Sequence, residues 1–139
     1  MLDAIRNFGQ NGADLLVGLS VGAAWIAAIV APNTSYNHLT AKQTEKHVRE
    51  LLKSASDPIA VIMLVAAALA ILGGAMVSGI LALIAAFGFF SNRWTLGSFK
   101  TESGKEEAPG KTQRILAVSM TLLFGLAAAA AAILAVLGI

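Results

Sequence analysis

Residues 58–91, PIAVIMLVAAALAILGGAMVSGILALIAAFGFFS, contain no charged side chain over thirty-four positions. A single α-helix of that length would be about 51 Å long at 1.5 Å per residue. The hydrocarbon core of a bilayer is about 30 Å thick, so one straight crossing does not accommodate the segment. The pairs Gly73-Gly74 and Ser78-Gly79 are the places where a helix is weakest. The segment therefore predicts two helices, 58–74 and 77–92, joined by a tight turn.

Two further charge-free blocks lie on either side of this segment, at Leu15–Ala31 and Ile115–Ile139. The chain of 139 residues is 57% hydrophobic and 13% charged, whereas soluble domains average about 25% charged residues. A charge at the bilayer centre costs roughly 2.5–3.5 kcal/mol, which explains why charges avoid these blocks. We therefore predict an all-α integral membrane protein that forms a single domain over residues 1–139. Its four transmembrane helices are expected at about 14–31, 58–74, 77–92 and 115–138.

The ends of the first two predicted helices rest on proline signals. Pro32 and Asn33 are expected to end the first helix, because the residue before proline disfavours helix. Pro32 also makes the block a poor signal-peptide cleavage site, so we interpret it as a retained helix. Ser56 and Asp57 can cap the second helix, and Pro58 suits its first turn.

Two polar segments connect the predicted helices. In the first, Thr40 precedes Gln43 at capping-box spacing, and apolar residues then recur at helical intervals. This pattern predicts an amphipathic helix at about 40–55 that lies in the membrane interface. The alternative is a helix packed on the soluble surface of a partner. In the second segment, Ser, Thr, Gly and Glu dominate, and we predict a flexible polar loop over 95–112.

Basic residues indicate how the helices are oriented. With four crossings, both polar segments lie on one side and carry nine of the ten basic residues, Lys42, Lys46, Arg49, Lys53, Arg93, Lys100, Lys105, Lys111 and Arg114. The other side has Arg6 alone. The positive-inside rule then places both loops in the cytoplasm of a bacterial inner membrane. Three crossings would divide the basic residues almost equally and leave little orientation signal.

Residues able to carry chemistry are scarce. None of the four predicted helices has Asp, Glu, Lys, Arg or His in its interior, and the chain has no cysteine. Proton pathways, ion sites and haem sites in membranes nearly always need such residues. His38 and His47 match no strong zinc pattern. We therefore predict no catalytic residues, no metal site and no cofactor, and expect that the chain is not an enzyme. Its small net charge of +2 does not favour nucleic acid.

The positive signals are small residues and interfacial side chains. Small residues at four-residue spacing let helix backbones approach closely in lipid. The candidates for helix packing are Gly18, Gly22, Gly74, Ser78 and Gly125. They can serve packing inside the bundle, docking onto a larger partner, or both. The candidates for contact with lipid headgroups and the membrane interface are Lys42, Lys46, Arg49, Arg93 and Trp94.

One stretch, about residues 15–75, resembles a known group. It combines Gly18 and Gly22 with Trp25, Ala31-Pro32, Leu39-Thr40, an amphipathic helix and a second apolar helix. This order resembles small bacterial four-helix membrane proteins of unknown function that are related to a eukaryotic transmembrane protein implicated in platinum-drug resistance. The chain departs from that pattern at Asn33-Thr34, where the group usually has a bulky apolar residue. The resemblance implies four helices and carries over no catalytic residues.

Two functional hypotheses follow from these observations. The first is an accessory or scaffolding subunit that packs against a larger bacterial membrane complex, respiratory or photosynthetic, with membrane lipids and other membrane subunits as its partners. The second is a small independent transporter, channel or lipid-handling protein that acts as an oligomer. The second predicts a cavity lined by Ser78, Ser119 or Thr121.

Overall fold

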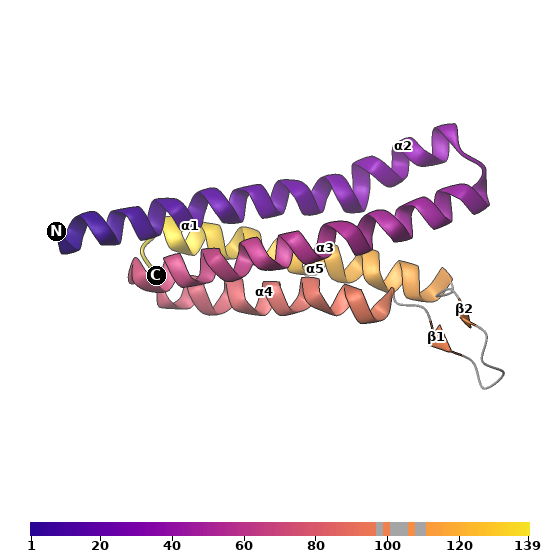
Figure 1. The fold of residues 1–139 in the computed structure, drawn as a ribbon. Helices are drawn as coiled ribbons and strands as arrows, with labels where there is room; N and C mark the ends of the chain where they lie inside the picture. The colour runs from indigo at the N-terminus through magenta and orange to yellow at the C-terminus, as the bar shows by residue number, and fades with distance from the viewer. Residues whose placement is uncertain (97–98, 101–105, 108–110) are drawn as a thin grey trace.

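The fold places four long helices side by side around a ring, in the order α1 (Leu2–Trp25), α3 (Ala41–Leu72), α4 (Met76–Thr95) and α5 (Lys111–Val136) (Figure 1). The computed structural model describes residues 1–96, 99–100, 106–107 and 111–139. Four helices in this part of the chain are long and apolar enough to cross a membrane, at Leu2–His38, Ala41–Leu72, Met76–Thr95 and Ile115–Val136. The prediction of an all-α, multi-pass helical membrane protein with four spans is confirmed.

The N-terminal span is one continuous helix, made of α1 (Leu2–Trp25), the π-helical segment η1 (Ile26–Val30) and α2 (Ala31–His38). The predicted end at Ala31 is therefore wrong. Pro32 has no N–H to donate and its ring crowds the preceding turn. The π segment widens that turn, and the Ala31 N–H bonds the Ile26 carbonyl, five residues back. The helix thus absorbs the proline and ends only at His38, where Leu39 becomes extended.

The second span, α3 (Ala41–Leu72), is also continuous, and it begins at the start predicted for the amphipathic helix at 40–55, not at 58 as predicted for the span. The Thr40 backbone N–H donates to Gln43 Oε1 at 3.1 Å, in the predicted capping box. The prediction of a separate interfacial helix at 40–55 is wrong, because α3 continues through Pro58. One buried stripe explains this: Thr44, Val48, Leu52, Ser56, Ile59, Ala60, Met63, Ala66, Ala67 and Ala70 all face the bundle. Continuous packing of that stripe outweighs the roughly 3 kcal/mol cost of an interior proline.

The turn between α3 and α4 (Met76–Thr95) lies where the glycine pair predicted it. Gly74 adopts φ +84, a conformation that glycine reaches without steric cost. The Gly74 N–H bonds the Ile71 carbonyl and the Ala75 N–H bonds the Ala70 carbonyl, which is the Schellman arrangement. The predicted helices 58–74 and 77–92 are thus correct at the turn and differ at their outer ends.

The last helix, α5 (Lys111–Val136), begins a turn earlier than predicted. Between α4 and α5, the short strands β1 (Phe99–Lys100) and β2 (Glu106–Glu107) pair antiparallel. The flexible loop predicted over 95–112 otherwise falls on residues 97–98, 101–105 and 108–110, outside the described part of the chain. The core where the helices meet consists mainly of alanine, with Phe89, Met63, Ile59 and Val17 as its larger members.

Two ends of the bundle differ in what they carry. The α3–α4 turn and both chain termini lie at one end, and the α2–α3 connection and the end of α4 lie at the other (Figure 1). At the second end, α2 and the first turns of α3 diverge from α4 and α5 (Figure 1). We refer to these two ends as the turn end and the loop end. An even number of crossings places both polar segments at the loop end.

Candidate functional site

Gly18 and Gly22 lie on the outer face of α1. The residues of α1 that face the bundle are Gly9, Ala13, Val17, Ser20 and Ala24. A Cβ atom built on Gly18 or Gly22 would meet nothing within 4 Å. Leu15, Leu19 and Trp25 beside them are also exposed. These two glycines therefore leave a shallow, unfilled strip on the outside of the bundle.

The other three predicted packing residues differ in burial: Ser78 is buried, Gly125 is half-buried and Gly74 is exposed. Gly74 forms the turn, with the Arg6 guanidinium packed over its Cα. The Ser78 hydroxyl donates to the Ala131 carbonyl at 2.6 Å and joins α4 to α5. Gly125 faces α1, where a Cβ atom would lie 3.8 Å from Ala24 Cβ. That separation is ordinary van der Waals contact, so the position has room for a larger side chain.

Sequence reasoning missed the closest helix contacts. A Cβ atom on Gly9 would lie 2.7 Å from the Leu69 carbonyl oxygen, and one on Gly73 would lie 2.8 Å from the Gln10 nitrogen. A Cβ atom on Gly88 would overlap the Phe124 ring. Gly9 and Gly73 share no local spacing, because they come from different helices. Only the pairing of α1 with α3 makes them a close contact.

A buried polar cluster joins α3, α4 and α5 near the loop end. Asn92 Nδ2 donates to Ser56 Oγ at 3.0 Å and to Thr121 Oγ1 at 2.7 Å. Both hydroxyls already donate to carbonyls of their own helices, Ser56 to Leu52 and Thr121 to Ala117. They can therefore only accept from Asn92, which determines the orientation of its amide. Asn92 Oδ1 is enclosed and has no hydrogen-bond partner in the described part of the chain.

Asp14 is a further residue that sequence reasoning placed differently. It was expected at the start of the first helix, but α1 begins at Leu2 and Asp14 lies inside it. The expectation that the helix interiors hold no charged group is therefore wrong at this position. Asp14 Oδ1 is enclosed and lacks a hydrogen-bond partner among residues 1–96 and the other described segments.

The predicted headgroup residues all lie toward the loop end. Lys42, Lys46 and Arg49 occur in the first turns of α3, and Arg49 is paired with Glu50 at 3.6 Å. Arg93 lies in the last turn of α4, 3.9 Å from the Asp57 carboxylate. Trp94 beside it is 73% exposed. These five residues therefore lie on α3 and α4 at the loop end, and their contact with lipid headgroups stays a prediction.

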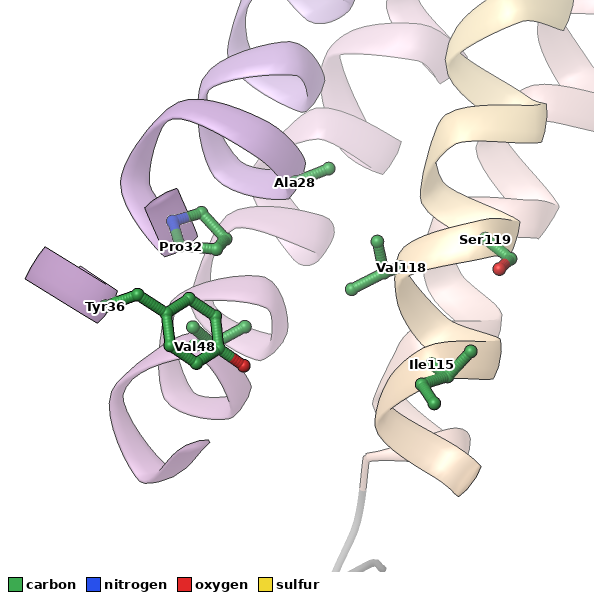
Figure 2. A pocket seen from close by; sticks show the side chains of 7 residues that line it. All are labelled: Ala28, Pro32, Tyr36, Val48, Ile115, Val118 and Ser119. Atoms are coloured by element: carbon green, nitrogen blue, oxygen red, sulfur yellow. The ribbon is translucent and has the colours of Figure 1, made fainter. Parts of the chain in front are cut away.

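Two cavities open on the outer side of the bundle, along the line where α1, η1 and α2 face α5. We call this line the α1–α5 seam. The first cavity, of 290 Å³, lies between Val21, Ala24, Trp25 and Ile29 on one side and Thr121, Leu122, Gly125, Leu126 and Ala129 on the other. The second, of 230 Å³, is lined by Ala28, Pro32, Tyr36, Val48, Ile115, Val118 and Ser119. Figure 2 shows Pro32 and Tyr36 across the second cavity from α5.

Of the three hydroxyl residues predicted to line a cavity, two do so and one does not. Ser119 and Thr121 line the seam cavities, whereas Ser78 is buried and bonded to Ala131. His38 and His47 are exposed, and no group of three or more metal-ligating side chains occurs in the described segments. A third cavity, of 300 Å³, lies beside His47 and is lined by Leu39, Gln43, Lys46, His47 and Glu50.

Comparison with known proteins adds no relative to these observations. No family model, curated protein or solved structure matches this chain. The resemblance over residues 15–75 therefore stays an expectation, and function is argued from the geometry of this chain alone.

Proposed function

We propose that this protein is an accessory or scaffolding subunit that packs against a larger complex of the bacterial cytoplasmic membrane, with both polar segments in the cytoplasm. The observation that carries the proposal is the open strip at Gly18 and Gly22, where a Cβ atom would meet nothing within 4 Å. In lipid, small residues at this spacing bring helices together because their backbones can approach closely. The bundle does not use the strip itself, so it is free for a helix of another subunit.

The side chains around the strip fit that role. Trp25 is 57% exposed, and Leu15 and Leu19 are also exposed. Large apolar side chains beside two glycines form ridges next to a groove, the shape into which a neighbouring helix packs. A respiratory or photosynthetic complex is the class of host that we propose, because such assemblies contain small helical subunits without chemistry of their own.

Co-purification tests the proposal. The tagged chain is extracted from native membranes in mild detergent and its partners are identified by mass spectrometry. We expect one set of membrane subunits to accompany the wild-type chain and to be lost from Gly18→Leu and Gly22→Leu variants. Ala68→Leu is the matched control, because Ala68 is exposed on α3, away from the strip. A wild-type chain that migrates alone at every load contradicts the subunit proposal.

The independent lipid-handling protein is the second candidate, favoured by the two seam cavities. Both open on the side of the bundle, and Ser119 and Thr121 are among their lining residues. The core between the helices is filled by alanine, Phe89 and Met63, which does not favour a central channel. Among the alternatives of transporter, channel and lipid handling, these cavities favour lipid handling.

A further inference from the structure

Two successive cavities lie along the α1–α5 seam. The cavities follow each other along the same helices, because their lining residues run from Val21 to Tyr36 on one side and from Ala129 back to Ile115 on the other. At the turn end the seam is closed, since a Cβ atom on Gly138 would lie 3.6 Å from the Gln10 side chain. The unfilled part of the seam therefore lies between Val21 and the loop end.

Two features of the sequence leave the seam unfilled. Ala24, Gly125 and Ala129 supply almost no side-chain volume where the helices face each other. The π segment at Ile26–Val30 then changes the helical register before Pro32, and α2 diverges from α5 beyond it (Figure 1). As a result, the Pro32 and Tyr36 side of the second cavity stands apart from Val118 (Figure 2).

We propose that the α1–α5 seam binds one acyl chain of a phospholipid whose headgroup lies at the loop end. The seam faces outward from a bundle whose helices are long and apolar enough to cross a membrane, so hydrocarbon is the solvent that reaches it. From Ile115 to Ala129 it extends about 21 Å along α5. One leaflet of the hydrocarbon core is about 15 Å deep, so an acyl chain lies along the seam without bending.

The loop end of the seam supplies the polar contacts that a headgroup needs. Tyr36 and Ser119 border the second cavity, and the hydroxyls of both can donate to phosphate or ester oxygens. In the described part of the chain, Lys42, Lys46, Arg49 and Arg93 lie at this end. The cavity nearer the turn end is lined almost entirely by apolar side chains, and the Thr121 hydroxyl there is already bonded to Ala117. Because the loop end of the seam is polar and the cavity nearer the turn end is apolar, the headgroup lies at the loop end and the acyl chain extends toward the turn end.

A partner helix is a poorer occupant of the seam than an acyl chain. A helix with its side chains is about 10–12 Å across, whereas the cavities hold 230 and 290 Å³ between side chains that remain in place. A chain of single methylene width fits such a space. The open strip at Gly18 and Gly22, which lines neither cavity although Trp25 borders both surfaces, is the surface suited to a helix. The lipid proposal therefore does not depend on the subunit role, and either can fail without the other.

Retained lipid tests the proposal on the full chain. The protein is purified in mild detergent, and its phospholipid is counted by phosphorus analysis and identified by native mass spectrometry. We expect the wild-type chain to retain phospholipid, and Gly125→Leu to retain roughly threefold less because the leucine fills the apolar cavity. Ala129→Leu, at a second lining position, is expected to behave in the same way. Gly125→Ala should retain wild-type amounts, since its Cβ fits without displacing a neighbour.

Ala68→Leu provides the matched control for added bulk on an outer face, and it should leave the retained phospholipid unchanged. Circular dichroism establishes that each variant is helical before its lipid is counted. Equal retention in the wild type, Gly125→Leu and Ala129→Leu overturns the proposal. So does a loss of the same size in Ala68→Leu, or a retained molecule that is not a phospholipid.

Discussion

At the scale of single residues, contacts between helices decide what each small residue does. Gly18 and Gly88 look alike in the sequence, each in an apolar helix. Gly18 lies on an open outer face, whereas Gly88 supports the ring of Phe124. The spacing of Gly18 and Gly22 was detectable in the sequence, but the contact of Gly88 was not, because Phe124 lies on another helix.

This difference predicts opposite effects of the same substitution. Gly88→Ala is expected to destabilise the protein by about 1–3 kcal/mol, because the new methyl group overlaps the half-buried ring of Phe124. Gly18→Ala is the matched control and should be neutral or slightly stabilising, because alanine is the better helix former. Denaturation midpoints in detergent measure both. Equal midpoints for the two variants would contradict the assigned contact.

The Asn92 cluster leads to a second prediction at this scale. In Asn92→Asp, a carboxylate oxygen replaces the amide that donates to Ser56 and Thr121, whose hydroxyl protons are already committed. We expect a loss of about 1–3 kcal/mol in the free energy of unfolding, and a smaller loss in Asn92→Ala. Unfolding midpoints at neutral pH distinguish the two variants. If Asn92→Asp is as stable as the wild type, the hydroxyls are not oriented as described.

At the scale of elements, packing decides how far a helix continues. Pro32 and Pro58 were both interpreted as boundaries, and both lie within continuous helices. The capping box at Thr40, the glycine turn and, apart from its first turn, the last helix were predicted correctly from the sequence, because their signals are local. The helix boundary predicted at Pro58 was wrong because the buried stripe from Thr44 to Ala70 keeps one face of α3 packed on both sides of this proline. Burial of a long helix face stabilises the helix by more than the few kcal/mol that an interior proline costs.

Replacing Pro58 distinguishes an interior position from a helix start. Pro58→Ala restores a backbone donor inside α3, and we expect the thermal midpoint to rise, by up to about 3 kcal/mol of unfolding free energy. A proline in the first helical turn would instead contribute favourably, and its replacement would be neutral or harmful. A lower midpoint for Pro58→Ala therefore contradicts the continuous helix.

At the scale of the whole molecule, two of the four spans exceed the bilayer. The N-terminal span has 37 residues and α3 has 32, or about 55 and 48 Å at 1.5 Å per residue. A hydrocarbon core of about 30 Å leaves α2 and the first turns of α3 to project at the loop end. The predicted interfacial helix is thus the projecting part of a span, and it carries Lys42, Lys46 and Arg49.

Single cysteines test this arrangement, because the chain contains none of its own. Lys42→Cys and Trp94→Cys lie at the loop end, and Ala4→Cys lies near the turn end; all three positions are exposed. In oriented membrane vesicles, we expect a membrane-impermeant maleimide to label the first two from one side and the third from the other. If Lys42→Cys and Trp94→Cys are labelled from opposite sides, the arrangement of four crossings is wrong.

The sequence by itself determined the membrane class, the four spans and the turn at Gly73-Gly74. These properties follow from hydropathy and local backbone preference, which any stretch of chain carries without reference to the rest. Only the tertiary structure decided which glycines are enclosed, that Pro32 and Pro58 lie inside helices, and that the α1–α5 seam is open. Those properties depend on the distance between atoms of different helices. No single segment contains that information, because it arises only when α1, α3, α4 and α5 pack together.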